Sequence, residues 1–453
     1  MAELPRKSLA RTAKLAALPL GYAGRSALGL GKRLGGASAE MVLTDIQQRT
    51  AEQLFRTLGE LKGGAMKAGQ AMSIFEAALP EELTAPYREN LRRLQDSAPP
   101  MPTITVREIL AEQLGPDWQR SLVEFDAEPA AAASIGQVHR GRWVDGREVA
   151  IKVQYPGADK ALYSDLKQLS RLAGSLSPIL PGIDVSALMK ELRDRAVEEL
   201  DYDLEAESQQ RFADLYAGDP DIVIPNVVRA APKVIVSEWM DSTGSLLSII
   251  EDGTTEQRDH YGQELAKFLF GSPSRVGMLH ADPHPGNFRL IPTDNGHPGK
   301  LGVLDFGAVA RLPEGNLPTS LGTLIRIAAM DDYDELVNSL REGGFIKDKV
   351  KIDPQKLKDY LGPFVEPTEV DEFHFTRKWM RRQFNRINDP KGDAFSVMTR
   401  LNLPPEYLLI HRTWTGGVGV LSQLEARVRF RELMIEHLPG FADPDSNADS
   451  DAD

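Results

Sequence analysis

Residues 280–287 read His-Ala-Asp-Pro-His-Pro-Gly-Asn, which places a carboxylate, Asp282, five residues before a carboxamide, Asn287. An aspartate in a fixed loop can orient or deprotonate an attacking hydroxyl or water, and the asparagine oxygen can bind Mg²⁺. Two alternatives stay open. The stretch also fits an ordinary Pro/Gly turn. A zinc site on His280 and His284 is disfavoured, because the prolines oppose the helix that would bring both rings together.

Three further charged residues have types and positions that suit phosphate chemistry. Lys152 ends the strand-like run Val-Ala-Ile-Lys, where a lysine can bind the α- and β-phosphates of a nucleotide if a carboxylate holds it. Glu205, in an acidic helical stretch, is the candidate partner. Asp305 follows the apolar run Leu-Gly-Val-Leu and is placed to bind Mg²⁺. Each motif alone fits a solvated surface or a chance string, but together and in this order they predict a site for ATP or ADP with Mg²⁺.

A run of alanines stands where a protein kinase has its glycine-rich loop. Aligned on the pattern G-x-G-x-x-G-x-V, the chain has alanine at the first two glycine positions and Gly136 at the third. Alanine restricts positive φ and the close approach of phosphate. We therefore expect a nucleotide clamp with an altered grip, which weakens γ-phosphate transfer or shifts preference toward ADP. The residues expected to contact nucleotide here are Ala131, Ala132, Ala133, Ser134, Gly136 and Val138.

The elements that must position these residues follow a strand-first, helix-later order. Two alternating runs joined by Asp145-Gly146 predict a β-hairpin with a two-residue turn. A long helix is expected from Asp184 to Gly218, and within it Asp201 and Glu205 share one face. Strand candidates follow at 221–228 and 233–240. From about residue 245 the chain is expected to be mostly helical, apart from a loop-and-strand region at 279–309.

Composition sets the remaining limits. The chain has 453 residues, too many for one hydrophobic core. Its net charge of −13 argues against nucleic-acid binding through a basic surface, and the lack of cysteine excludes disulfides, thiolate metal sites and thiol catalysis. No stretch approaches the roughly 18 apolar residues that span a bilayer.

The two ends of the chain differ in charge. Residues 1–35 carry seven Lys or Arg against the single acid Glu3. This arm is either a solubilising extension or a basic segment that lies on an anionic membrane. The acidic end is expected to be disordered. The predicted units are a basic arm at 1–35, a helical extension at 36–115, an N-terminal lobe at 116–244, a helical C-terminal lobe at 245–440 and a disordered tail at 441–453.

The motifs together resemble those of the UbiB/ADCK (AarF-like) atypical kinases. The resemblance covers about residues 40–440 and rests on "KAGQ" at 67–70, "AAASIGQVH", "VAIK", "ELDYDLE", "HADPHPGN" and "DFG". It implies an α+β, bilobal protein-kinase-like fold with an N-terminal helical extension that carries the Lys-x-Gly-Gln motif. In the family this extension packs over the site where a protein kinase would receive its peptide.

The resemblance also implies roles for single residues. Lys67 and Gln70 would face inward from the extension and meet Glu199 and Asp201, either as a structural interlock or as part of the chemistry. The segment from Glu238 to Met240 would receive adenine through its backbone. The catalytic set would be Asp282, Lys152 and Glu205, and the magnesium ligands would be Asn287 and Asp305.

The family's association with isoprenoid quinone biosynthesis and lipid handling implies the function. We expect an ATPase stimulated by membranes more than a protein kinase, cytoplasmic and peripheral to a membrane. The expected partners are a nucleotide, an anionic membrane surface through residues 1–35, and quinone-biosynthesis proteins or a lipid-like small molecule, with no nucleic acid. Two alternatives stay open: a phosphotransferase acting on a small molecule or protein, and a nucleotide-gated scaffold of a biosynthetic complex.

Overall fold

The computed structural model describes residues 100–133, 135–159, 190, 197–198, 200–293, 299–389, 392–398 and 400–442. The predicted basic arm, residues 36–99 of the predicted extension and residues 443–453 of the predicted tail lie outside these ranges. Lys67, Gln70, Ser134 and Glu199 therefore lie outside the described residues, and their expected roles stay predictions.

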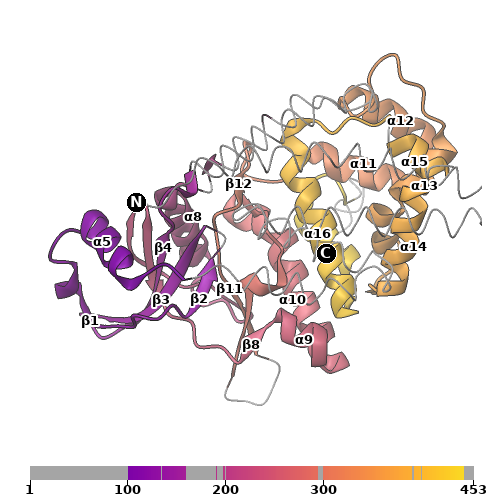
Figure 1. Ribbon diagram of the computed structural model, residues 1–453. Helices are drawn as coiled ribbons and strands as arrows, with labels where there is room; N and C mark the ends of the chain where they lie inside the picture. The colour runs from indigo at the N-terminus through magenta and orange to yellow at the C-terminus, as the bar shows by residue number, and fades with distance from the viewer. Residues whose placement is uncertain are drawn as a thin grey trace, which may run out of the picture.

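An antiparallel sheet forms one end of the molecule (Figure 1). Its strands run in the order β1-β3-β4-β7-β6, and β2 pairs with β3. Apolar and β-branched residues dominate its central strands, as expected for a sheet covered on both faces. The strands are β1 (Leu122–Phe125), β2 (Ala131–Ala133), β3 (Gly136–Trp143), β4 (Glu148–Gln154), β6 (Val227–Ala231) and β7 (Val234–Glu238).

Alternation along β4 decides which side chains meet which helix. Val149, Ile151 and Val153 are fully buried and pack in one core with helix α5 (Thr103–Leu114). The residues between them point to the opposite face, because successive strand residues alternate. Lys152 thereby faces the helix α8 (Tyr202–Leu215), which packs in a separate small cluster with Ile235 of β7.

The predicted hairpin is present, but its turn is longer than expected. The Trp143 N–H donates to the Arg147 carbonyl at 2.7 Å, and the Gly146 N–H donates to the Trp143 carbonyl at 2.9 Å. The loop therefore has three residues, Val144 to Gly146, and Gly146 takes the positive φ of 93° that such loops need at their last position. The two-residue prediction was wrong because Val144 does not continue the ladder.

The predicted long helix is also interrupted. Asp201 has an extended backbone, and its carboxylate accepts from the N–H groups of Asp203 and Leu204 at 3.1 Å each. It is the N-cap of α8, so it does not share a helix face with Glu205. An aspartate is a preferred N-cap, and here that preference outweighed the apolar period that suggested one continuous helix.

The rest of the described chain is mostly helical, with a loop-and-strand region at its centre as expected (Figure 1). It has two cores: one around α10 is aromatic-rich and includes Phe268, Trp414 and Phe430, and a second lies between α11, α12 and α13. The helices are α9 (Leu246–Asp252), α10 (Thr255–Val276), α11 (Thr319–Ala329), α12 (Tyr333–Glu342), α13 (Pro354–Val365), α14 (Arg377–Asn388), α15 (Asp393–Met398), α16 (Leu408–Leu424) and α17 (Phe430–His437).

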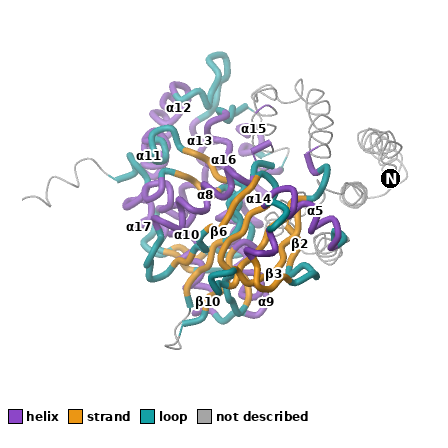
Figure 2. Tube along the Cα trace, turned by 90° about the vertical axis from the view of Figure 1, so that its left-hand side faces the viewer, coloured by secondary structure: helices purple, strands orange, loops and turns teal. Residues whose placement is uncertain are grey.

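Short strands carry the central region. β10 pairs with β11 in a four-stranded sheet of order β5-β11-β10-β8, β9 pairs with β12, and β13 pairs with β14. Figure 2 shows the strands of the two larger sheets on one side of the molecule and helices α11, α12 and α13 on the other. The strands are β5 (Ile222–Val223), β8 (Gly244–Ser245), β9 (Met278–His280), β10 (Phe288–Ile291), β11 (Lys300–Val303), β12 (Val309–Arg311), β13 (Phe373–His374) and β14 (Arg427–Val428).

Helices long and apolar enough to cross a bilayer do not occur among the residues that the structure describes.

One buried histidine in the sheet has a fixed protonation state. His139 of β3 is fully buried, with Nδ1 at 2.8 Å from the Asp126 carbonyl oxygen and Nε2 at 2.8 Å from the Gln137 side-chain nitrogen. A carbonyl only accepts and an amide nitrogen only donates, so the ring is neutral with its proton on Nδ1. Burial lowers the pKa of His139, partly offset by its bond to the Asp126 carbonyl.

This arrangement predicts acid sensitivity of the fold. The folded pKa lies below the unfolded value of about 6.5, so the unfolded chain binds more protons and stability falls as pH drops below 6.5. One such histidine contributes a loss of up to about 1.4 kcal/mol per pH unit. Urea unfolding at pH 7, 6 and 5 measures it. We expect a smaller loss for His139→Phe, and the wild-type loss for His374→Phe, whose ring is exposed. Equal losses in all three proteins would contradict this assignment.

Candidate functional site

Three charged residues that are far apart in the sequence meet beside the sheet. Lys152 Nζ lies 2.6 Å from Glu205 Oε1 and 3.6 Å from Asp305 Oδ1. The lysine comes from β4, the glutamate from α8 and Asp305 from the loop after β11. The Glu205 side chain is 4% exposed and the Lys152 side chain 15% exposed, so the pair is nearly removed from water. The predicted pairing of Lys152 with Glu205 is present in the structure.

The lysine remains charged despite its burial. Burial opposes the charge, but the carboxylates of Asp305 and Glu205 outweigh it and raise the pKa of Lys152. The ammonium also lies 5.2 Å from the centre of the Tyr202 ring, which favours the cation. A permanently charged lysine with a second carboxylate 3.6 Å away suits the binding of phosphate and its metal ion.

The loop after β9 holds the predicted Asp282 and Asn287 together. The Asn287 side-chain nitrogen donates to Asp282 Oδ2 at 3.0 Å and to the Asp282 carbonyl at 3.3 Å. Pro285 and Gly286 begin a short 3₁₀ turn, Pro285–Asn287, as their types favour. Since Nδ2 is engaged in this way, the Asn287 side-chain oxygen is the group left to bind a metal ion.

Strand register brings Asn287 next to Asp305. Phe288 of β10 pairs with Val303 of β11, and the Leu304 N–H donates to the Asn287 carbonyl at 2.8 Å. Asp305 is the next residue along the chain. Two oxygen ligands plus phosphate oxygens and water are the set that Mg²⁺ usually takes in nucleotide sites. The donors present therefore fit the predicted magnesium nucleotide.

The zinc interpretation is not supported. His280 Nε2 donates to the Asp305 carbonyl at 2.8 Å, and His284 Nδ1 accepts from the Gly286 N–H at 3.2 Å. Burial lowers the pKa of both histidines. Within the described ranges, no group of three or more His, Cys, Asp or Glu is placed to hold a metal ion, which a zinc site needs. Both rings support the loop instead.

Asp305 itself is held in an uncommon backbone conformation. Its φ is 62°, in the left-handed region that non-glycine residues rarely adopt. The next residue, Phe306, is buried and packs against Phe212 of α8 and His280 of β9, with ring centres 5.1 and 5.4 Å apart. Such strain persists where the surroundings fix the residue, and it is typical of functional sites. The Phe306 contacts supply that fixation.

Sequence patterns gave no sign of one further residue of the site. Arg412 of α16 donates to Asp282 Oδ1 at 3.1 Å, although 130 residues separate them. The neighbouring Thr413 hydroxyl lies 3.4 Å from the His280 carbonyl. Arginine is common on helices and no motif surrounds Arg412, so only the packing of α16 on the loop reveals this contact. Both carboxylate oxygens of Asp282 are thus engaged, one by Asn287 and one by Arg412.

The alanine run forms a strand rather than an open loop. Ala131, Ala132 and Ala133 pair with Val138, Gln137 and Gly136 in register. None of them, nor Gly136, has a positive φ. Alanine therefore fits this backbone without strain, and the φ argument made from the sequence does not apply. What alanine changes is the added Cβ on an exposed strand.

Gly136 is required for packing instead. A Cβ at this position would lie 2.3 Å from the Val153 carbonyl oxygen and 2.9 Å from the Tyr202 hydroxyl. The third glycine of the pattern therefore lets β3 approach β4 and α8 closely. This close approach helps to place Lys152 of β4 against α8, and contact of Gly136 with phosphate stays a prediction.

Part of the segment expected to bind adenine already makes contacts within the protein. The Glu238 carboxylate accepts from the Asn226 side chain at 2.9 Å and from Arg147 at 3.1 Å, and these contacts help to lower its pKa against the effect of burial. The Glu238 N–H donates to the Asn226 carbonyl. Met240 packs its sulfur against Gly302. The Glu238 side chain is thus structural, and contact of this segment with adenine stays a prediction.

Comparison with known proteins agrees with this geometry. A family model described as the ABC1 atypical kinase-like domain matches residues 93–340. The atypical kinase COQ8, mitochondrial, of Schizosaccharomyces pombe is 30% identical over 91% of this chain and 66% of its own length. The protein ACTIVITY OF BC1 COMPLEX KINASE 1, chloroplastic, of Arabidopsis thaliana is 31% identical over 84% of this chain and 54% of its own. The chain thus spans 54% to 66% of the length of these two relatives.

A solved structure is similar over most of the chain. It is the complex of Rv3197 with erythromycin from Mycobacterium tuberculosis, with a TM-score of 0.66 at 43% sequence identity. The match covers 90% of this chain and 100% of that one.

The buried ion pair predicts a specific pattern of stability. Lys152→Met leaves the Glu205 carboxylate buried without its cation, which costs about 3–5 kcal/mol. Adding Glu205→Gln removes the uncompensated charge, so the double variant should be more stable than Lys152→Met alone. Urea unfolding measures all three proteins. As a control, Lys358→Met breaks an exposed pair with Asp331 and should change little. Additive losses in the double variant would contradict the pairing.

Substitutions at Gly136 and Ala131 should differ strongly in their effect on stability. Gly136→Ala forces a Cβ against the Val153 carbonyl and should destabilise the protein by about 1–3 kcal/mol. Ala131→Gly alters an exposed strand position and should change the free energy of unfolding far less. Thermal unfolding of both variants is the measurement. A stable Gly136→Ala protein would show that the close contact is unnecessary.

Proposed function

We propose a function from the family and the site together. The chain belongs to the ABC1 atypical kinase-like family, which is the UbiB/ADCK family whose motifs the sequence carries. We propose that it is an atypical kinase-fold ATPase that binds ATP or ADP with Mg²⁺. The single observation that carries this proposal is the Lys152–Glu205 pair with Asp305 beside it. Each of these side chains comes from a different part of the fold. A nucleotide site explains why all three charged groups are held together, because phosphate and Mg²⁺ would bind them.

Each residue of the site has a distinct part in the proposal. Lys152 binds the α- and β-phosphates, and Glu205 keeps it in place. Asn287 and Asp305 hold Mg²⁺, which when bound neutralises charge on the phosphates. Asp282 orients the attacking water. The expected clamp on the nucleotide is the β2–β3 hairpin, through the alanine strand and Gly136.

Asp282 is oriented from two sides, which suits a residue that positions an attacking group. Arg412 holds one carboxylate oxygen and Asn287 the other. Each oxygen has a second lone pair, so Asp282 can still accept a hydrogen bond from water or from the hydroxyl of an acceptor. We propose water as the attacking group, and a phosphotransferase acting on a small molecule or protein is the alternative.

The cellular part of the proposal rests on the family. We propose that nucleotide turnover supports isoprenoid quinone biosynthesis or the handling of a lipid-like small molecule at a membrane surface. Residues 1–35 are the proposed contact with anionic lipid, and quinone-biosynthesis proteins are proposed partners. The relatives are named as mitochondrial and chloroplastic proteins. The similarity to a protein solved with erythromycin adds macrolides as candidate ligands of this chain.

The deciding experiment measures ATP hydrolysis by the full chain with Mg²⁺, with and without phosphatidylglycerol liposomes. Asp305→Asn removes a metal-binding carboxylate and should lower turnover on the order of 100-fold. Asp331→Asn is a matched control, because Asp331 has the same φ of 62° but lies on the surface, away from the site. Liposomes should raise wild-type turnover, and deletion of residues 1–35 should remove that increase.

The outcomes separate the alternatives. Absence of both Mg-nucleotide binding and hydrolysis would overturn the proposal. Transfer of labelled phosphate to a defined acceptor would favour the phosphotransferase. Full cellular function of Asp282→Asn, with loss of function in variants that cannot bind nucleotide, would favour the scaffold. Turnover that liposomes leave unchanged would remove only the membrane part of the proposal, and a lack of erythromycin binding would remove only the macrolide part.

A further inference from the structure

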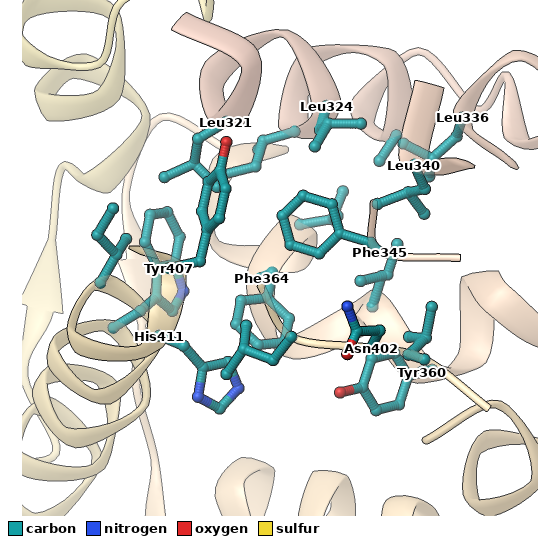
Figure 3. A pocket seen from close by; sticks show the side chains of 18 of the residues that line it. Leu321, Leu324, Leu336, Leu340, Phe345, Tyr360, Phe364, Asn402, Tyr407 and His411 are labelled. Carbon is teal, nitrogen blue, oxygen red and sulfur yellow. The ribbon is translucent and has the colours of Figure 1, made fainter. Parts of the chain in front are cut away.

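A pocket of about 420 Å³ lies among the C-terminal helices, and none of the proposed nucleotide-site residues lines it (Figure 3). Its walls come from α11, α12, α13 and α16 and from the segment before α16. The lining is almost entirely aliphatic and aromatic, with Leu324, Leu340, Phe345 and Phe364 among the side chains around the space. This volume falls within the roughly 300–1,000 Å³ of small-molecule sites.

Among the residues that the structure describes, no lysine, arginine, aspartate or glutamate lines the pocket. The single histidine of the wall, His411, has its pKa lowered by burial. A charged ligand would therefore lose its hydration without gaining a counter-ion, which is costly. The occupant must be uncharged.

Two polar groups break the apolar lining on one side. Figure 3 shows the Tyr360 and Asn402 side chains together at one side of the space. The Asn402 nitrogen donates to the Gly344 carbonyl at 2.9 Å, whereas its Oδ1 is buried and has no hydrogen-bond partner within the described residues. Burial raises the pKa of Tyr360, so its hydroxyl keeps its proton. On this side, the wall thus presents one unsatisfied acceptor and one hydroxyl.

The contents of such a pocket follow from its walls. Water needs two to four polar partners, and most of this surface offers none. An empty cavity costs stability in proportion to its volume. An extended peptide would bring backbone groups that these walls cannot satisfy. A helix is about 10–12 Å across, so little more than one turn would fill the space. A small apolar molecule fits better than any of these.

We propose that this pocket binds an uncharged, largely apolar molecule with a single hydroxyl group. That hydroxyl donates to Asn402 Oδ1 and accepts from the Tyr360 hydroxyl, while the apolar body contacts the leucines and phenylalanines. The site gives the lipid-like partner of the proposed function a location, but it stands on the pocket alone and needs no nucleotide.

The test is a titration of the full chain with all-trans-retinol, an apolar molecule with one hydroxyl whose fluorescence rises in apolar surroundings. We expect saturable binding of one retinol per chain. Leu361→Trp fills the pocket from α13 and should weaken binding at least tenfold. Leu215→Trp makes the same exchange at an exposed position on α8 and should leave the affinity unchanged.

A second variant tests the hydrogen bond to the hydroxyl group of the ligand and changes the packing of the pocket far less. Tyr360→Phe keeps the ring and removes only the hydroxyl, so retinol should bind about two- to tenfold more weakly, as the net value of one hydrogen bond implies. Tyr333→Phe, at a tyrosine outside the pocket wall, should not change the affinity.

Three results would overturn the proposal. They are retinol binding that does not saturate, an affinity unaffected by both Leu361→Trp and Tyr360→Phe, and an experimental structure in which residues of this same chain fill the pocket. Because the titration contains no nucleotide, loss of retinol binding and loss of ATP hydrolysis are independent outcomes.

Discussion

The buried pair between Lys152 and Glu205 is the constraint on which the rest of the site depends. Two opposite charges removed from water are tolerated only when their geometry is good and their neighbours complete the hydrogen bonding. β4 supplies that geometry by burying Val149, Ile151 and Val153 against α5, which turns Lys152 to the other face. α8 supplies the partner, and its position depends on the Asp201 cap and on the close approach that Gly136 allows.

The helix α16 contacts both the candidate nucleotide site and the apolar pocket. Arg412 and Thr413 contact the loop that holds Asp282, while His411 and Trp414 line the apolar pocket. Consecutive residues on one helix point in different directions, so a single element serves both places. The loop that holds Asp282 and the pocket therefore share a wall, and the orientation of Asp282 depends on how α16 packs between them.

The alanine strand changes how the kinase-like loop is understood. Glycine-rich loops use glycine for unusual backbone angles, but here Ala131 to Ala133 pair regularly with β3, and neither these alanines nor Gly136 has a positive φ. The altered grip stays a prediction, and its physical basis is now the added Cβ groups on an exposed strand. Gly136 is retained because β3, β4 and α8 meet there without room for a side chain.

Much of the site was predictable because its motifs are local. Strand alternation, Pro/Gly loop chemistry and the spacing of Asp282, Asn287 and Asp305 are properties of short segments, so sequence alone determined the fold class, the charged set and the Lys152–Glu205 pairing. The break at Asp201, the partner Arg412 and the pocket were decided by tertiary structure. At Asp201, the preference for a helix cap competes with helix periodicity. The contact of Arg412 spans 130 residues, so it leaves no local pattern in the sequence. The pocket exists only because separate helices do not fill the space between them.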